Sequence, residues 1–546
     1  MPEAASDRCR FHIGTGFFIG FGSVFPYTTN RMSRPKWSVI LVFAAIAILL
    51  VLIRIQPSFP DPDSFYHAKM ALMIRDHGFL HAFPWLQETV MRDRYVDAHW
   101  LYHVLIIPFV TVFDPMVGMR VSAVLFGLLA FYALYRFLKA VGSPYPEWLT
   151  IVGALSFDFL QRMSMPKAGA LSVTLLMVAA WAMLKARPRA LFVVSVLFVW
   201  LYHGWPVLYG AFACLALGTL VADRLVPRPG SDRFHGLREL KPLAKALVLG
   251  TAAGIVVNPY FPSGLAFMTT DFLKNAVTGG ANIPVGAEWS PLPWLTMFQN
   301  DILAFCLLGV VIVLLFAAGA TRLFDLTNAK ARNVFFFLSL MAIFGAFTFR
   351  SARFMEYLIP FLLLTVGAIL SVADPFVRKD ARAFRAVVRN PHTSLKVLFV
   401  VVSLAIGCLA ARDIRYGMSD NGYFSASQYE GSARWLHRYL PRRQIVFNPV
   451  WDSSMMYFYL DDLHYYLVGL DPRFMYDADK GRYQTWFDIQ MGKDADVSKI
   501  ESTFHASAVL VDRRLKTDFV KNLEASDLFE KRYEDEWTQV YTRKDL

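Results

Sequence analysis

The chain has 546 residues, of which 55 are Lys or Arg and 43 are Asp or Glu, so its formal net charge is +12. Charged residues make up only 18% of the chain, whereas globular domains carry about 25%. Hydrophobic residues make up 55%, and the mean hydropathy of +0.39 requires an apolar solvent for much of the surface. The composition indicates a polytopic membrane protein and excludes nucleic-acid binding as the reason for the basic charge, because the excess Lys and Arg lie in short loops between apolar runs.

Eleven segments are apolar and long enough, or nearly so, to cross a bilayer as helices of about 20 residues. These predicted spans are 38–55, 119–138, 147–162, 169–184, 190–204, 206–222, 243–257, 301–320, 333–349, 354–374 and 395–411. Arg31, Arg34 and Lys36 place the start of the first span in the cytoplasm, because positive loops stay on that side. Twenty Lys and Arg residues then fall in predicted cytoplasmic loops, against five in the short outer loops. The odd number of spans puts the C-terminal tail outside.

Two segments in the first part of the chain are not predicted to span. Residues 101–113 are apolar, but the segment is short and contains Pro108, so a re-entrant or interfacial helix is expected. Residues 1–36 lack the cleavage pattern of a signal peptide. We expect an N-terminal segment that is disordered or precedes the natural start of the protein, at Met32.

The tail from residue 412 to 546 is rich in Asp, Arg, Lys and Tyr. Short strands are predicted at 444–450, 464–470, 506–512 and 536–542, with helix-favouring residues at 453–460 and 516–529. The expected fold class is thus an all-α polytopic membrane domain, residues 37–411, with about 11 transmembrane helices and a first outer loop with interfacial helices. A small extracytoplasmic α/β domain, residues 412–546, follows it.

The first outer loop carries two carboxylates, Asp61 and Asp63, directly after a membrane span. Asp63 can cap the helix that follows. Alternatively, two carboxylates so close together at the membrane have reason to bind a cation or a proton. His99 and His103 have the i, i+4 spacing of metal ligands, but without a third ligand we expect them to pack at the interface.

Charged groups near the other outer helix ends form a second set of candidates. Arg162 and Lys167 follow the third span, and either contact lipid headgroups or bind an anionic phosphate. Glu288 lies in a later outer loop, and Arg350, Arg353 and Glu356 recur at helical spacing. An Arg–Glu ion pair or a guanidinium phosphate site fits that spacing. Because the central turns of the spans contain almost no charge, chemistry at the outer rim is favoured over transport at the midplane.

These motifs, in this order, resemble the C-type glycosyltransferase superfamily, most nearly the catalytic subunit of oligosaccharyltransferase, over about residues 38–470. The matching segments are Asp63 in PDSFYHAKMA, Arg162 in FLQRMSMPKAGALS, the stretch WLYHGWPV, Glu288 in EWSP, Arg353-Phe354, and Trp451-Asp452 in VWD. Members of that superfamily are polytopic membrane enzymes that use polyprenyl-linked sugar donors on the outer or lumenal side.

The resemblance implies a membrane glycosyltransferase that moves a sugar or oligosaccharide from a polyprenyl-phosphate or pyrophosphate donor to a protein or glycan acceptor. The expected catalytic residues are Asp63 and Glu288, which are also tentative ligands of Mg²⁺ or Mn²⁺. The expected donor-phosphate site consists of Arg353, Arg350, Arg162 and Lys167. The expected acceptor site consists of Trp451 and Asp452. Membrane lipids are expected partners, and nucleic acid is not.

Two departures from the family pattern bear on this expectation. The second-loop Asp-x-Asp that helps to hold the divalent metal has no counterpart, since Lys167 and its neighbours stand there. In the acceptor motif, Val450 replaces the first Trp, and Ser453-Ser454 replace Tyr-Gly. A requirement for metal and a peptide acceptor therefore do not carry over. The alternatives are a transporter or flippase of a lipid-linked sugar, or a non-catalytic relative of the superfamily.

Overall fold

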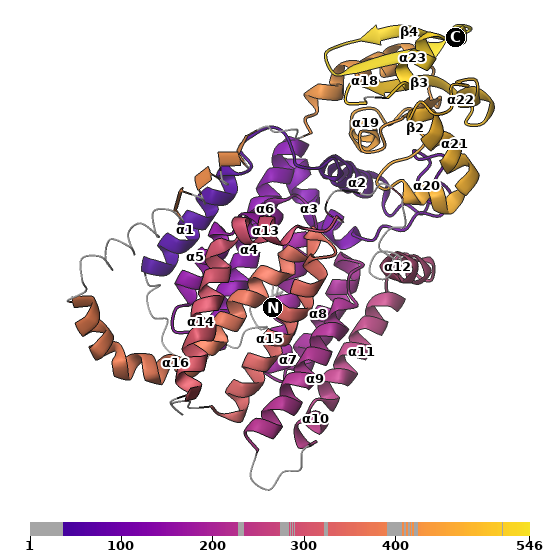
Figure 1. Cartoon of the computed structure of the whole chain (residues 1–546). Helices are drawn as coiled ribbons and strands as arrows, with labels where there is room; N and C mark the ends of the chain where they lie inside the picture. Colours follow the sequence, from indigo (N-terminus) through magenta and orange to yellow (C-terminus); the bar gives the residue numbers. More distant parts are fainter. Residues whose placement is uncertain are drawn as a thin grey trace, which may run out of the picture.

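A computed structural model of the chain shows a bundle of helices with a small sheet region at one end (Figure 1). The structure describes residues 37–227, 234–273, 290–320, 326–389, 424–515 and 517–546, together with Ile283, Gly286, Glu288 and a few positions between 407 and 419. The predicted N-terminal segment, 1–36, and most of the last predicted span, 395–411, lie outside the described residues. Most residues around the predicted domain boundary at 412 also lie outside the described residues.

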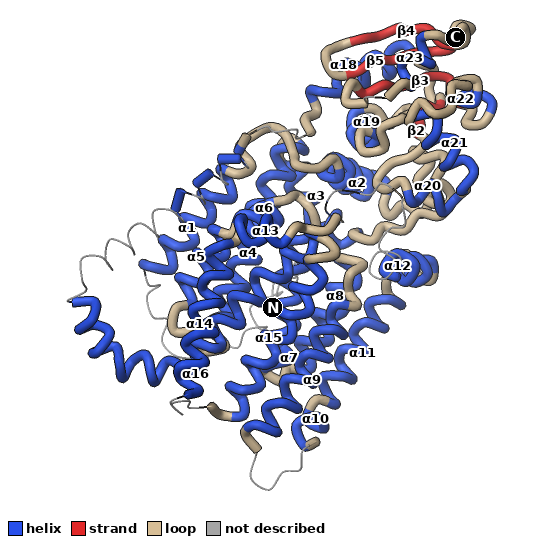
Figure 2. Tube along the Cα trace, in the orientation of Figure 1, coloured by secondary structure: helices blue, strands red, loops and turns tan. Residues whose placement is uncertain are grey.

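Helices dominate the first part of the chain (Figure 2). They are α1 (Trp37–Leu52), α2 (Asp63–His77), α3 (Trp100–Val112), α4 (Pro115–Ala140), α5 (Pro146–Leu155), α6 (Phe157–Ser164), α7 (Gly169–Leu184), α8 (Pro188–Leu201), α9 (Val207–Leu225), α10 (His235–Glu239), α11 (Lys241–Val256), α12 (Ser263–Leu273), α13 (Trp294–Asn300), α14 (Ile302–Ala320), α15 (Asn328–Thr348), the 3-10 turn η3 (Ala352–Phe354) and α16 (Met355–Arg389). Each predicted span up to 354–374 coincides with a helix or with a pair of helices.

Four of the described helical segments are long and apolar enough to cross a membrane: α4, α9, α15 and Ala352–Val372, which joins η3 to the first part of α16. The number rises to six if the bent pairs α6 with α7 and α13 with α14 each count as one span. The predicted count of 11 is not confirmed. One reason is that α1, α8 and α11 have only 14 to 16 residues, and such helices rise less than the about 30 Å of a bilayer core.

The predicted span 147–162 is wrong as a single helix, because the chain breaks at Ser156. This residue is extended, with ψ of 112°, and its hydroxyl accepts a hydrogen bond from the amide of Phe159 at 3.3 Å, as a helix cap does. The next two helices, α6 and α7, meet at 108°. Lys167 lies at this bend and Arg162 in the last turn of α6, so both sit where the chain reverses.

The first outer loop contains two short helices, α2 and α3. The predicted helix at 101–113 is confirmed as α3, which has 13 residues and includes Pro108. Of the two alternatives for Asp63, the helix cap is not found: α2 begins at Asp63 itself, the N-cap residue is Pro62, and no side chain caps the helix. The Asp63 carboxylate is therefore available for another contact.

A five-stranded sheet forms the core of the C-terminal part, with the order β2-β1-β3-β5-β4. The strands are β1 (Ile445–Phe447), β2 (Tyr465–Tyr466), β3 (Ala506–Asp512), β4 (Phe529–Glu534) and β5 (Thr538–Arg543), and the helices are α18 (Ser427–Tyr439), α19 (Ser454–Leu460), α20 (Arg473–Ala478), α21 (Lys480–Gln490), α22 (Lys499–Ser502) and α23 (Phe519–Glu524). Strand β1 is parallel to β2 and β3, whereas β5 is antiparallel to β3 and β4. All four predicted strands are present, and β4 was not predicted.

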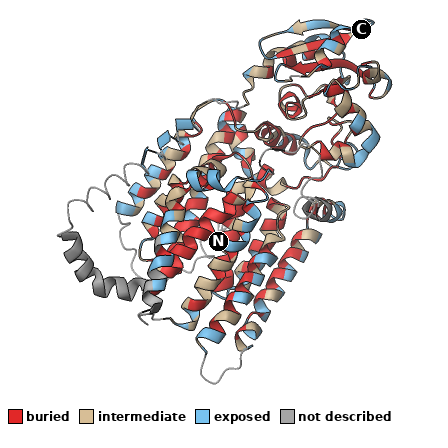
Figure 3. Cartoon of the chain, in the orientation of Figure 1, coloured by how far each residue is buried: buried red, intermediate tan, exposed pale blue. Residues whose placement is uncertain are grey.

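The first outer loop joins the helices to the sheet region. Phe59 pairs with Phe424 in an antiparallel bridge, and Leu86 pairs with Tyr466 in a parallel one. An ion pair joins Glu88 to Arg482 at 2.7 Å. Buried side chains run from the helical bundle through α2 to α19 beneath the sheet (Figure 3). The loop therefore holds its carboxylates between two packed regions.

Candidate functional site

Lys167 contacts both aspartates of the first outer loop. Its ammonium nitrogen lies 2.8 Å from Asp63 Oδ2 and 3.2 Å from Asp61 Oδ2. Asp63 opens α2, and Lys167 lies at the bend between α6 and α7, so two segments about 100 residues apart meet here. We name Lys167, Asp61 and Asp63 the lysine cluster.

Two arginines and two glutamates form a second group, the arginine cluster. Arg162 donates to Glu356 Oε2 at 2.8 and 3.0 Å and to Glu288 Oε2 at 2.7 Å. Arg353 donates to the other oxygen of Glu288, Oε1, at 2.7 Å. Each oxygen of Glu288 thus serves a different arginine. The predicted pair of Arg353 with Glu356 is long, at 4.0 Å, because Glu356 is held mainly by Arg162.

Backbone contacts fix the segment that carries Glu288. The Ser351 hydroxyl donates to the carbonyl oxygen of Glu288, and the Ala352 amide donates to that of Ser290, both at 2.9 Å. Arg353 follows directly in η3, and its guanidinium lies 5.3 Å from the ring centroid of Tyr202. A cation over an aromatic face keeps its charge while losing water. Arg353 is therefore held on one side by a ring and on the other by Glu288.

The local charges separate two carboxyl groups by their pKa. Burial raises the pKa of Asp61 to about 6, although Lys167 partly opposes this shift. Burial also acts to raise the pKa of Glu288, but Arg353, Lys167 and Arg162 outweigh it and lower the value well below the usual range. Glu288 is thus a fixed anion, whereas Asp61 can exchange a proton near neutral pH.

The remaining candidates lie apart from these clusters. Arg350 is exposed, in contrast to Arg353, whose side chain is 15% exposed. Trp451 and Asp452 belong to the C-terminal part, where Asp452 pairs with Arg514 at 3.1 Å. Burial raises the pKa of Asp452. The structure therefore brings together five of the predicted site residues (Asp63, Arg162, Lys167, Glu288 and Arg353) and leaves three of them elsewhere.

A chain of contacts nevertheless leads from the acceptor motif back to the lysine cluster. Arg514, the partner of Asp452, lies with its guanidinium 5.0 Å from the ring centroid of Phe424. Phe424 pairs through its backbone with Phe59, at 2.8 Å in both directions. Phe59 is two residues before Asp61. The segment with Asp452 is thus tied to the loop that carries the catalytic candidates.

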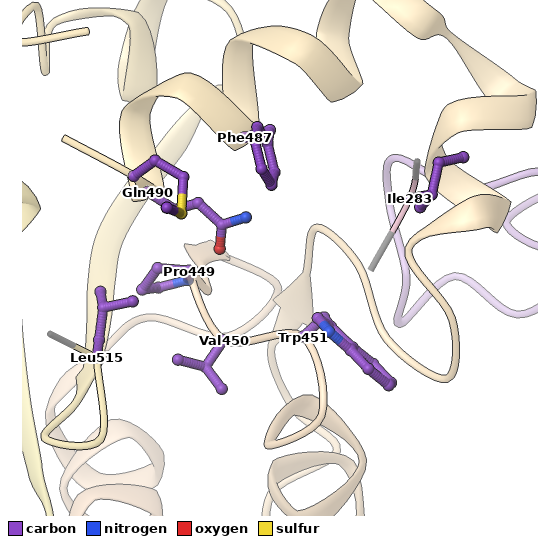
Figure 4. Close-up of a pocket in the computed structure, with 8 residues that line it drawn as sticks. Ile283, Pro449, Val450, Trp451, Phe487, Gln490 and Leu515 are labelled. Carbon is purple, nitrogen blue, oxygen red and sulfur yellow. The ribbon is translucent and has the colours of Figure 1, made fainter. Parts of the chain in front are cut away.

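An apolar cavity of about 600 Å³ lies beside the acceptor motif. Its lining residues are Ile283, Pro449, Val450, Trp451, Phe487, Gln490, Met491 and Leu515. Figure 4 shows Phe487 and Val450 on opposite sides, with the amide of Gln490 pointing into the space between them. Such a cavity suits an apolar or ring-shaped group that needs few hydrogen bonds.

The lysine cluster does not fit a divalent metal. Its two carboxylates already share the Lys167 ammonium at hydrogen-bond distance, and a metal ion there would meet that positive charge at close range. Within the described residues, no group of three or more His, Cys, Asp and Glu side chains has metal-binding geometry. Asp63 and Glu288, the tentative ligands, instead belong to separate ion-pair clusters. The residues present hold the Lys167 ammonium between the two carboxylates.

Sequence reasoning missed a buried hydrogen-bond chain beside α2. His103 Nδ1 lies 2.6 Å from Asp97 Oδ2, and His103 Nε2 lies 2.7 Å from His67 Nδ1. The expectation of simple packing for His103 overlooked Asp97, which the sequence places six residues earlier without a motif. The one available signal was the number of histidines in this loop.

Comparisons with known proteins place the fold. No known family model matches the chain, and no curated protein sequence does. The structure is similar to the apo form of the Archaeoglobus fulgidus oligosaccharyltransferase, with a TM-score of 0.60 and 13% identity over 88% of this chain and 70% of that one. It is also similar to ArnT from Cupriavidus metallidurans, with a TM-score of 0.54 and 13% identity over 93% and 98% of the two chains.

A third similar structure is the mycobacterial arabinofuranosyltransferase AftD, with a TM-score of 0.50 and 13% identity over 94% of this chain and 40% of that one. At these identities the likeness concerns the fold. The likeness nevertheless extends over most of this chain in each case, so it includes both the membrane helices and the C-terminal sheet region. The chain therefore has the fold of the C-type membrane glycosyltransferases, the superfamily that its sequence motifs resemble.

Proposed function

We propose that the protein is an integral membrane glycosyltransferase that transfers a sugar from a polyprenyl-phosphate or pyrophosphate donor to an acceptor. The observation that carries the proposal is the pair of clusters at one end of the bundle, in which Arg353 and Arg162 lie beside Glu288, and Asp63 lies beside Lys167. This arrangement supplies cations for a leaving phosphate and a carboxylate for an acceptor, on a fold that similar structures use for sugar transfer.

The arginines carry the donor side of the reaction. Arg353 would bind a phosphate oxygen and neutralise the charge that develops when the sugar–phosphate bond breaks, as fixed donors do most effectively in a site shielded from water. Arg162 supplies a second guanidinium, and Lys167 adds positive charge nearby. Arg350, which is exposed, would contact the phosphate only from the surface. The ArnT structure holds undecaprenyl phosphate, and an archaeal oligosaccharyltransferase structure holds a dolichol-phosphate. These ligands support a lipid-linked donor here.

The aspartates carry the acceptor side. Asp63 would orient the nucleophile of the acceptor, and Glu288 would keep the two arginines in register. Because Lys167 already neutralises one negative charge of the lysine cluster, we infer that Mg²⁺ or Mn²⁺ is not required. The ammonium of Lys167 would take over the charge compensation that a metal supplies in related enzymes.

The site would face the outside of the membrane. The sheet region, α2 and α3 all lie at the same end of the helical bundle (Figure 1). The excess of Lys and Arg in the predicted cytoplasmic loops supports this orientation. In a bacterial cell this means an inner-membrane protein with its N-terminus in the cytoplasm and its C-terminal part outside.

The cavity beside Trp451 would receive the acceptor. Trp451 and Phe487 offer ring faces on which an apolar side chain or the face of a sugar can pack. Trp451→Ala should raise the KM for the acceptor about tenfold and leave the KM for the donor unchanged, and Tyr439→Ala, on an exposed ring of α18, is the control. Equal effects on both substrates would contradict this assignment.

A turnover assay tests the proposed function. The purified protein in lipid nanodiscs is incubated with radiolabelled undecaprenyl-phosphate monosaccharides and a cell-envelope fraction as acceptor, and released undecaprenyl phosphate is measured. We expect release by the wild type and a loss of about 10²-fold or more in Arg353→Ala. A transporter would move the labelled donor across the bilayer of a vesicle and release no undecaprenyl phosphate.

A further inference from the structure

The buried chain of Asp97, His103 and His67 has a fixed direction of hydrogen bonding. The side chains of Asp97 and His103 are at most 1% exposed, and His67 is 5% exposed. A carboxylate only accepts hydrogen bonds, so His103 must donate from Nδ1 to Asp97 at 2.6 Å. An imidazole with its single proton on Nδ1 has a lone pair on Nε2, and in this form His103 accepts from His67 Nδ1 at 2.7 Å.

This order leaves His67 with a proton on Nδ1 and a lone pair on Nε2. Burial lowers the pKa of His67 well below its usual value, so the ring is neutral at physiological pH. The hydrogen bond to His103 is the only one that the His67 ring makes within the part of the chain that the structure describes. The Nε2 atom of His67 is therefore a free base. The tautomer of the His67 ring is set, through His103, by the buried carboxylate of Asp97.

The position of His67 links this base to both charge clusters. Asp63 and His67 are four residues apart on α2 and share one face of the helix. The charge of Lys167 acts on the His67 ring. On its other side, the ring centroid of His67 lies 5.7 Å from that of His99, and His99 lies 5.7 Å from Tyr202, the ring under Arg353.

We propose that His67 is a catalytic residue that takes the acceptor's proton, and that Asp97 and His103 are positioning residues that hold its tautomer. The proposal rests on the proposed function and deepens it, since it assigns the base. Asp63 is engaged by Lys167 at 2.8 Å, so it orients the acceptor, whereas the lone pair of His67 has no competing cation bonded to it.

With a hydroxyl as the acceptor group, the acceptor oxygen forms a bond to the anomeric carbon of the sugar, and the bond from that carbon to the phosphate oxygen breaks. The electron pair leaves with the polyprenyl phosphate, beside Arg353. The hydroxyl proton moves to His67 Nε2, and the imidazolium that forms is stabilised through His103 by the carboxylate of Asp97.

Activity measurements test the catalytic assignment. Relative to the wild type, His67→Gln should lower kcat by about 10²-fold, whereas His77→Gln, an exposed histidine on the same helix, should have no effect. In His67→Ala, added imidazole should restore part of the lost rate, because it can replace the missing base. Normal turnover by His67→Gln would overturn the proposal, and so would a slow His67→Ala that imidazole does not rescue.

A tautomer measurement tests the same proposal without activity. Nitrogen-15 NMR of histidine-labelled protein in nanodiscs, assigned by comparison with His67→Gln, should show His67 neutral and protonated at Nδ1. In Asp97→Asn the amide can donate to His103, which should reverse both tautomers and lower kcat about as much as His67→Gln. A His67 signal protonated at Nε2 in the wild type would overturn the proposal. The proposed function is judged separately, by release of polyprenyl phosphate from the wild type.

Discussion

The two charge clusters lie at the same end of the bundle but differ in balance. In the arginine cluster, two guanidinium groups face two carboxylates, and Glu356 is 1% exposed. In the lysine cluster, one ammonium faces two carboxylates, and the Asp63 side chain is 33% exposed. The first is neutral and closed, and the second is negative and partly open. The difference indicates that the closed cluster mainly stabilises the fold, whereas the open cluster can accept a hydrogen bond from a proton-donating group.

The closed cluster should be the more sensitive to losing a member. Arg162→Met leaves Glu356 buried without its principal partner, and breaking a buried ion pair in this way costs about 3–5 kcal/mol. We expect little folded protein in detergent, measured by size-exclusion chromatography and thermal unfolding. Adding Glu356→Gln should recover part of the loss, because the uncompensated charge is then removed. Arg189→Met, at an exposed position of α8, is the control.

Equal stability of Arg162→Met and Arg189→Met would show that the arginine cluster is not closed. It would then be better described as a solvated surface network.

The open cluster should instead be sensitive in activity. Asp63→Asn keeps the shape and polarity of the side chain but removes its charge, so folding should be intact and turnover should fall about 10²-fold. The matched control is Asp76→Asn at the other end of α2, where the carboxylate is exposed and pairs with Arg75. Turnover and thermal unfolding measured side by side separate the two effects. Near-normal turnover by a folded Asp63→Asn protein would remove Asp63 from the site.

The same cluster predicts how metal removal acts. Wild-type turnover should change less than twofold in EDTA, because Lys167 occupies the position that a cation would take. Lys167→Asp should create a group of three carboxylates, the oxygen-ligand environment that Mg²⁺ and Mn²⁺ prefer. Its turnover should then be lost in EDTA and restored in part by Mn²⁺.

Loss of wild-type activity on chelation, with full rescue by Mn²⁺ or Mg²⁺, would contradict this assignment of Lys167. Lys185→Asp controls for the added carboxylate, because Lys185 is exposed and lies at the other end of α7 from Lys167.

The two clusters also differ in how far the sequence could predict them. Asp63, Arg162, Lys167, Glu288 and Arg353 were all named from motifs, since charged residues at membrane helix ends stand out against apolar runs. Apart from the Arg353–Glu356 pair, their partners were not predicted, because pairing depends on the bend between α6 and α7. That bend lies between Ser164 and Gly169, and a separate break at Ser156 begins α6. Periodicity alone reveals neither.

Elsewhere the sequence predicted element type better than element length. Strand β3 was predicted over its full extent, as a buried apolar run. Strand β4, Phe529–Glu534, was missed because four of its six residues are charged and it lies at the edge of the sheet. The predicted count of 11 spans is not confirmed, because hydropathy does not distinguish a membrane-crossing helix from a shorter apolar helix such as α8.

The smallest expected effect concerns Asp61 and the pH dependence of stability. Because the pKa of Asp61 is raised from 3.8 to about 6 in the folded protein, the native state holds a proton that the unfolded chain has lost between about pH 4 and pH 6. This contribution to stability is present below pH 4 and is lost as the pH rises to about 6. The side chain in Asp61→Asn is neutral at every pH, so the stability of this variant relative to the wild type should increase over that interval. We expect the Tm difference, variant minus wild type, to increase by roughly 2–5 °C between pH 4.5 and pH 7, whereas Asp93→Asn, with an exposed side chain, should show no such trend. A difference independent of pH would mean that Lys167 keeps Asp61 ionised, and the lysine cluster would then be as firmly closed as the arginine cluster.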